Sequence, residues 1–101
     1  MARSELIPGI PDEAAGKILK LLSSVSPDGI ILFGSRAVGN YREGSDVDIA
    51  LKGAQLTLDD RSMINVKYPS LNLPWKLDIV IYSLIEEPLL KRHIDEAGVR
   101  L

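Results

Sequence analysis

The chain has 101 residues, of which 46% are hydrophobic and 26% charged, a composition typical of an ordinary globular domain. At this length folding buries roughly 60 to 68% of the surface that the unfolded chain exposes, which is enough for one modest core. We therefore expect a single domain over residues 1–101. Cysteine is absent, which excludes a disulfide framework, a thiolate metal site and a thiol nucleophile.

Charge and hydropathy also limit which kinds of partner the chain can have. The formal net charge is -2, from twelve basic and fourteen acidic residues, so the chain has no overall attraction for nucleic acid and no direct nucleic-acid binding is expected. Wholly apolar runs such as Ile30–Phe33 are far shorter than a membrane span, and Pro8 interrupts the start before any secretory segment. We expect a cytoplasmic protein that does not enter a membrane.

The first predicted element is an amphipathic helix, because apolar residues recur at spacings of three and four from Ala14 to Val25. A turn cluster at residues 26–29 then leads into Ile30–Phe33, an apolar run rich in β-branched residues that predicts a buried strand ending at Gly34. Residues 35–45 contain two glycines and an asparagine and predict one helical turn followed by a loop.

Two further strands are predicted over Asp46–Leu51 and Lys76–Tyr82, where polar and apolar residues alternate. Between them, Thr57 followed three residues later by an aspartate resembles a capping box and predicts a helix that ends before Pro69. A last helix is predicted from Pro88 to just before a glycine at position 98. This order predicts an α+β fold, a small mixed β-sheet flanked by helices.

The residues that indicate chemistry are three aspartates and a Gly-Ser dipeptide. Asp46 and Asp48 are two apart on a predicted strand, so their side chains point to one face. Asp78 lies on the polar face of the third strand, and pairing of these strands would gather three carboxylates, as a site for two divalent ions such as Mg²⁺ requires. Gly34 and Ser35 follow a buried strand, where bare backbone and a hydroxyl favour phosphate.

Phosphate beside metal ions indicates a nucleoside triphosphate. Arg36, Arg42 and Lys52 lie within a few residues of these groups and could offset the charge of the triphosphate.

At this point the sequence resembles a known family. Gly34-Ser35, ten further residues and Asp46-Val47-Asp48 resemble the signature of the nucleotidyltransferase superfamily that shares the DNA polymerase beta catalytic fold. Asp78 stands where that family keeps its third carboxylate. The small size, the residues after Ser35 and the ending at 88–98 most resemble the minimal nucleotidyltransferases, called MNT. In that family the partner is a helical HEPN protein, and the two act as antitoxin and toxin.

The resemblance implies two Mg²⁺ ions, ATP as substrate, and transfer of AMP to a hydroxyl group, expected to be a tyrosine of a HEPN toxin. Asp46 and Asp48 would bind both metal ions, and Asp78 would bind the ion on the nucleophile side, since a free Asp with a pKa of about 3.9 is a poor base at neutral pH. Ser35 would hold the β- or γ-phosphate, with Gly34 and Arg36 completing the nucleotide site.

Other residues have plainer interpretations. His93, the only histidine, lies on a charged predicted helix and is expected at the surface without a chemical role. Trp75 at the start of a strand is expected to anchor the edge of the core. Tyr41 and Arg42 are equally consistent with an exposed loop and with a nucleotide or acceptor contact.

Two alternatives to a protein-modifying enzyme stay open. The chain could be a non-catalytic antitoxin that masks the toxin by contact, with carboxylates that are vestigial or only hold nucleotide. It could instead modify a small molecule, as aminoglycoside-modifying relatives do, but 101 residues leave a monomer without a closed acceptor pocket. A homo- or hetero-oligomer could supply the missing wall.

Overall fold

The computed structural model describes residues 5–101 and contains a four-stranded sheet in the order β3-β2-β1-β4. β1 (Gly29–Phe33) pairs antiparallel with β2 (Val47–Lys52), and β2 pairs parallel with β3 (Leu77–Ile81). β4 (Val99–Arg100) pairs antiparallel with β1 at the other edge. The mixed sheet and its helices confirm the predicted α+β fold. β4 was not predicted, because two residues are too few to show an alternating pattern.

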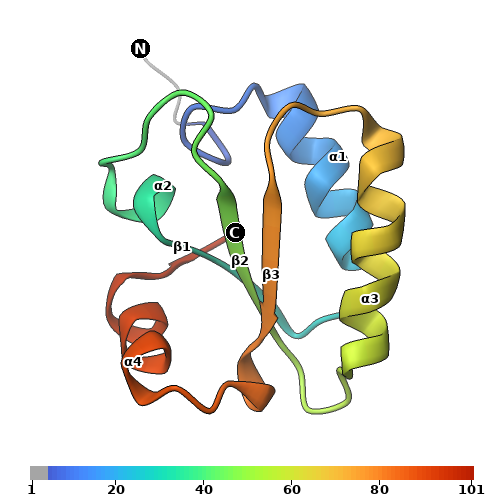
Figure 1. Cartoon of the computed structure of the whole chain (residues 1–101), viewed down its shortest axis with the longest axis vertical. Helices are drawn as coiled ribbons and strands as arrows, with labels where there is room; N and C mark the ends of the chain where they lie inside the picture. The colour runs from blue at the N-terminus through green and yellow to red at the C-terminus, as the bar shows by residue number, and fades with distance from the viewer. Residues whose placement is uncertain (1–4) are drawn as a thin grey trace.

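Helices cover both faces of the sheet. Figure 1 shows α1 (Asp12–Ser23) and α3 (Leu58–Lys67) on one side of the sheet and α4 (Pro88–Ala97) on the other. The short helix α2 (Ser35–Val38) follows β1, and its Ala37 packs against the main core. Two short 3₁₀ helices, η1 (Tyr68–Leu71) and η2 (Tyr82–Leu84), follow α3 and β3. Among residues 5–101, no helix is both long enough and apolar enough to cross a membrane.

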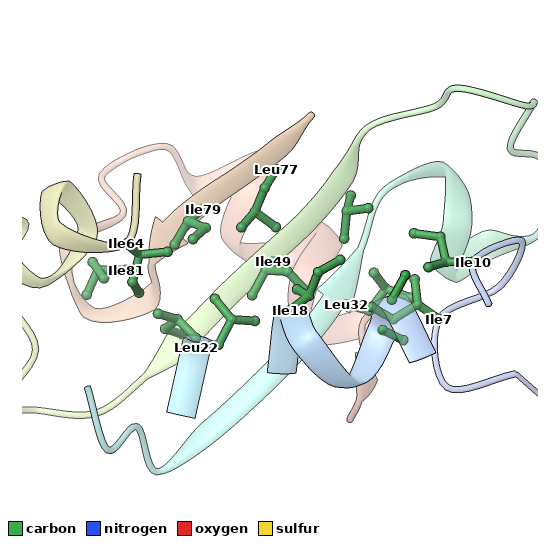
Figure 2. Close-up of a cluster of buried hydrophobic side chains, with 14 of the residues drawn as sticks. Ile7, Ile10, Ile18, Leu22, Leu32, Ile49, Ile64, Leu77, Ile79 and Ile81 are labelled. Atoms are coloured by element: carbon green, nitrogen blue, oxygen red, sulfur yellow. The ribbon is translucent and has the colours of Figure 1, made fainter. Parts of the chain in front are cut away.

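The main core lies between the sheet and the pair α1 and α3. Ile18 and Leu22 of α1 and Ile64 of α3 pack there against the apolar face of the strands, as Figure 2 shows. The strand side of this core consists of alternate residues, all buried: Leu32, Val47, Ile49, Leu51, Leu77, Ile79 and Ile81. Burial of each such side chain stabilises the fold by about 1.5 to 3 kcal/mol, so this face fixes the register of the sheet.

The opposite face of the sheet is only partly covered. Ile94 of α4 packs there against Ile31, Phe33 and Ala50, which form a second, smaller cluster. At the amino-terminal ends of β2 and β3, Asp48 is half-buried and Asp78 is exposed. Polar groups at those ends therefore remain within reach of a ligand.

The start of α3 confirms the predicted capping box. The Thr57 hydroxyl accepts a hydrogen bond from the Asp60 N–H at 3.4 Å, and the Asp60 carboxylate accepts one from the Thr57 N–H at 2.8 Å. Two N–H groups that helix geometry leaves without partners are satisfied in this way.

Candidate active site

The parallel pairing of β2 and β3 sets Asp48 directly beside Asp78. Neighbouring strands lie about 4.8 Å apart, and register partners in a sheet point to the same face, so the two carboxylates are neighbours. Asp46 lies one residue before β2, which begins one residue later than the predicted strand. The structure thus brings together the three aspartates that the alternation predicted on one face.

The pKa of Asp48 is shifted by its burial and by its charged neighbours. Burial raises the pKa of the Asp48 carboxyl, and the charges of Asp78 and Asp46 raise it further, while His93 acts in the opposite direction. The strand register sets Asp78 beside Asp48, and Asp46 is two residues before it, so these like charges lie within the roughly 10 Å over which exposed charges interact in 0.1 M salt. The three carboxylates therefore repel one another, and a cation between them would relieve that repulsion.

The donor chemistry of this cluster fits a hard divalent cation, which takes carboxylate oxygens as ligands. Within residues 5–101, however, no group of three or more His, Cys, Asp or Glu side chains is already arranged to hold a metal ion.

The Gly34-Ser35 turn lies against the same cluster. Gly34 has φ 76° and ψ -157°, a backbone conformation that essentially only glycine adopts. A Cβ at this position would overlap the carboxylate of Asp48, with its Cγ only 3.1 Å away. The Gly34 carbonyl accepts hydrogen bonds from the N–H groups of Ala37 and Val38, which fold the next residues into α2. Gly34 is thus required both by the turn and by the nearby carboxylate.

His93 is not the surface residue that the sequence led us to expect. It is half-buried, and its Nε2 accepts a hydrogen bond from the Gly34 N–H at 3.3 Å. Its ring meets Phe33 edge to face, with the ring centroids 6.2 Å apart. Sequence reasoning missed this residue because its place depends on how α4 packs against β1.

Arg36 differs from a typical exposed phosphate ligand, because only 2% of it is exposed. Its guanidinium donates to the carbonyl oxygens of Ser45 and Pro8 and lies 5.1 Å from the centre of the Tyr41 ring. Its assignment to the nucleotide site stays a prediction. For Tyr41, which the sequence left open, the structure gives a packing contact with this guanidinium.

The other cations predicted to offset the triphosphate charge are Lys52 and Arg42. Lys52 is at the end of β2, and its ammonium group is 4.5 Å from the centre of the Tyr82 ring. Arg42 is exposed in the loop before β2.

Trp75 packs against the main core, and its carbonyl accepts a hydrogen bond from the Tyr68 hydroxyl at 2.6 Å, which confirms the predicted anchor.

Comparisons with known proteins agree with this geometry. Residues 16–101 match the family model described as Polymerase beta, Nucleotidyltransferase. A crystal structure of a toxin-antitoxin with AMP-PNP is 31% identical, with a TM-score of 0.68 over 84% of this chain and 69% of that chain. A mutant of the toxin-antitoxin MntA-HpeT is 27% identical, with a TM-score of 0.67 over the same shares of the two chains.

A structure described as a candidate minimal nucleotidyltransferase covers 100% of both chains with a TM-score of 0.66, and its 23% identity supports the fold alone. No curated protein matches the chain.

Proposed function

Since the chain belongs to the polymerase beta nucleotidyltransferase family, we propose that it transfers AMP from ATP to a hydroxyl group of a partner protein. The observation that carries this proposal is the position of Asp48 beside Asp78 and against the Gly34 turn. Carboxylates and a phosphate-binding turn on one open face are the parts that such a transfer needs.

In this reaction the acceptor oxygen attacks the α-phosphorus of ATP in line. A bond forms between that oxygen and the phosphorus, and the bond to the bridging oxygen breaks, so pyrophosphate leaves with the electron pair. The N–H and hydroxyl of Ser35 would bind the tail of the triphosphate. The exposed carboxylate of Asp78 would receive the hydroxyl proton, although its main role would be as a metal ligand.

Mg²⁺ would be held by Asp46, Asp48 and Asp78. When bound, it lowers the pKa of the acceptor hydroxyl and offsets the charge of the leaving pyrophosphate. Burial raises the pKa of Asp48 most, and the charges of Asp78 and Asp46 raise it further; this repulsion supports the assignment, because it would be replaced by attraction to a cation.

We propose that the partner is a HEPN toxin, that its tyrosine is the acceptor, and that the chain acts in the cytoplasm as the antitoxin. Two of the similar structures are toxin-antitoxin pairs, and one of these contains the ATP analogue AMP-PNP. A partner bound over the open face would also supply the wall that an acceptor pocket needs.

The direct test is to incubate the chain with ATP labelled in the α-phosphate, Mg²⁺ and the HEPN protein encoded by a neighbouring gene. We expect label on the partner, and loss of label with Asp48→Asn. Asp59→Asn is the matched control, because Asp59 is an exposed residue of α3 away from the cluster. Absence of transfer by the wild type, or equal transfer by Asp48→Asn, would overturn the proposal.

One observation favours a second candidate, a module that neutralises the toxin by contact alone. The aspartates are not already arranged to hold a metal ion in the part of the chain described here, residues 5–101. A test in cells separates the two functions. If an Asp46→Asn, Asp48→Asn double variant still protects as well as the wild type, neutralisation depends on binding.

A further inference from the structure

Arg36 is the one charged side chain that is buried among residues 5–101. A buried guanidinium is tolerated only when its donors find acceptors. Its Nε and Nη2 donate to the carbonyl oxygen of Ser45 at 3.2 and 2.8 Å, and its Nη1 donates to the carbonyl oxygen of Pro8 at 2.7 Å. The side chain therefore connects three segments of the chain, around residues 8, 36 and 45.

The Pro8 end of this connection is fixed by the core. Ile7 and Ile10 on either side are fully buried, and the Ile10 N–H donates to the Ile7 carbonyl at 3.0 Å. Figure 2 shows both isoleucines beside Leu32 of β1. Because this short segment is anchored, the Pro8 carbonyl is a firm attachment point for the guanidinium.

The Ser45 end reaches the candidate site, because Asp46 is the next residue. Arg36 donates to the carbonyl of Ser45, which precedes Asp46. On the other side of Asp46, the Val47 N–H donates to the Lys76 carbonyl at 2.9 Å. The backbone of Asp46 is therefore held from both sides, by Arg36 and by the first hydrogen bond to the β3 segment. Without Arg36, the carbonyl before Asp46 would lose its two side-chain donors, and Ser45 would keep only its local hydrogen bonds with Arg42 on that side.

We propose that Arg36 is a positioning residue that sets the place of Asp46, and that it does not bind the triphosphate. This inference rests on the proposed function. Arg36 lies in the first turn of α2, directly after Gly34 and Ser35, so its side chain couples the phosphate turn to the loop that carries the carboxylate. The Tyr41 ring stacks against the guanidinium and helps to shield it from water.

Arg36→Lys separates the two roles. Lysine keeps the charge but cannot reproduce a planar fork that reaches two carbonyls. We expect kcat per folded molecule to fall by about tenfold or more, with a change in KM for ATP below about threefold. A KM increase of about tenfold with unchanged kcat would show a phosphate ligand, and unchanged values of both would show a purely structural residue. Either result overturns the proposal.

A second variant guards against a simple failure of Arg36→Lys to fold. A Cβ added at Gly9 would lie 2.7 Å from Nη1 of Arg36 and would overlap the Tyr41 ring. Gly39 has a similar positive φ, +89° against +79°, but nothing lies within 4 Å of its added Cβ. We expect Gly9→Ala to lower kcat and Gly39→Ala to leave it unchanged at equal folded fraction. Equal effects would contradict the proposal.

A binding measurement distinguishes failure of this inference from failure of the proposed function. Trp75, the only tryptophan, lines the same cavity of about 480 Å³ as Arg36 and can report Mg²⁺ binding by its fluorescence in the presence of AMP-PNP. If the wild type binds Mg²⁺ but transfers no AMP, the proposed function fails. Arg36→Lys should still need about tenfold more Mg²⁺, and an unchanged Mg²⁺ requirement would overturn the positioning role.

Discussion

Gly34→Ala tests the link between the Gly34-Ser35 turn and the carboxylates. The backbone at Gly34, with φ 76° and ψ -157°, costs a non-glycine residue about 1 to 3 kcal/mol. The new Cβ would also overlap the Asp48 carboxylate, so Asp48 must move. Together, the backbone strain and the overlap should lower the free energy of unfolding by about 3 kcal/mol. Each kcal/mol lowers the Tm of a chain of this size by about 4 to 8 °C.

Gly39→Ala is the matched control, because it carries the strain of a positive φ without a clash. It should cost about 1 to 2 kcal/mol, measured by urea unfolding. The clash itself is isolated by a double-mutant cycle, in which Gly34→Ala should cost at least about 1 kcal/mol less when Asp48 is already alanine. Equal costs for the two glycines, with no coupling to Asp48, would refute the contact between the turn and the carboxylate.

Three further outcomes follow from the same contacts. Burial and the charges of Asp78 and Asp46 raise the pKa of Asp48 above its usual 3.8. The ionised carboxylate therefore destabilises the fold above the raised pKa, and this penalty vanishes as the pH falls toward 3.8. Without metal, Asp48→Asn should raise the Tm at about pH 7 and have little effect on it near pH 3.5. His93→Phe keeps the ring but removes the acceptor for the Gly34 N–H, and KM for ATP should rise by about three- to tenfold, whereas a fall in KM would show that His93 competes with nucleotide. Thr57→Ala should cost about 1 kcal/mol in urea unfolding through loss of the α3 cap and leave AMP transfer unchanged.

Local patterns were sufficient for most of the fold. Alternation over two strands predicted which residues face the core, and hence that Asp48 and Asp78 share the other face, because side-chain direction in a strand depends only on position. The family resemblance, drawn from Gly34-Ser35 and the aspartates ten residues later, is confirmed by the family model over residues 16–101. The catalytic and metal-binding roles of these residues stay predictions.

What local patterns could not supply are contacts made through tertiary packing. The place of His93 beside Gly34 depends on the angle at which α4 crosses β1, 59 residues away in sequence. The burial of Arg36 depends on backbone carbonyls at Pro8 and Ser45, and carbonyls leave no signal in the amino-acid sequence. A positive residue beside a Gly-Ser turn therefore suggested a phosphate ligand, whereas its observed partners are neutral oxygens.

The most direct measurement is a crystal structure of the chain with AMP-PNP and Mn²⁺, which takes the place of Mg²⁺ and gives an anomalous signal. We expect Mn²⁺ peaks between Asp46, Asp48 and Asp78, with the triphosphate on the Gly34-Ser35 turn. Anomalous peaks away from these carboxylates, or nucleotide bound elsewhere on the molecule, would contradict the proposed nucleotidyltransferase site.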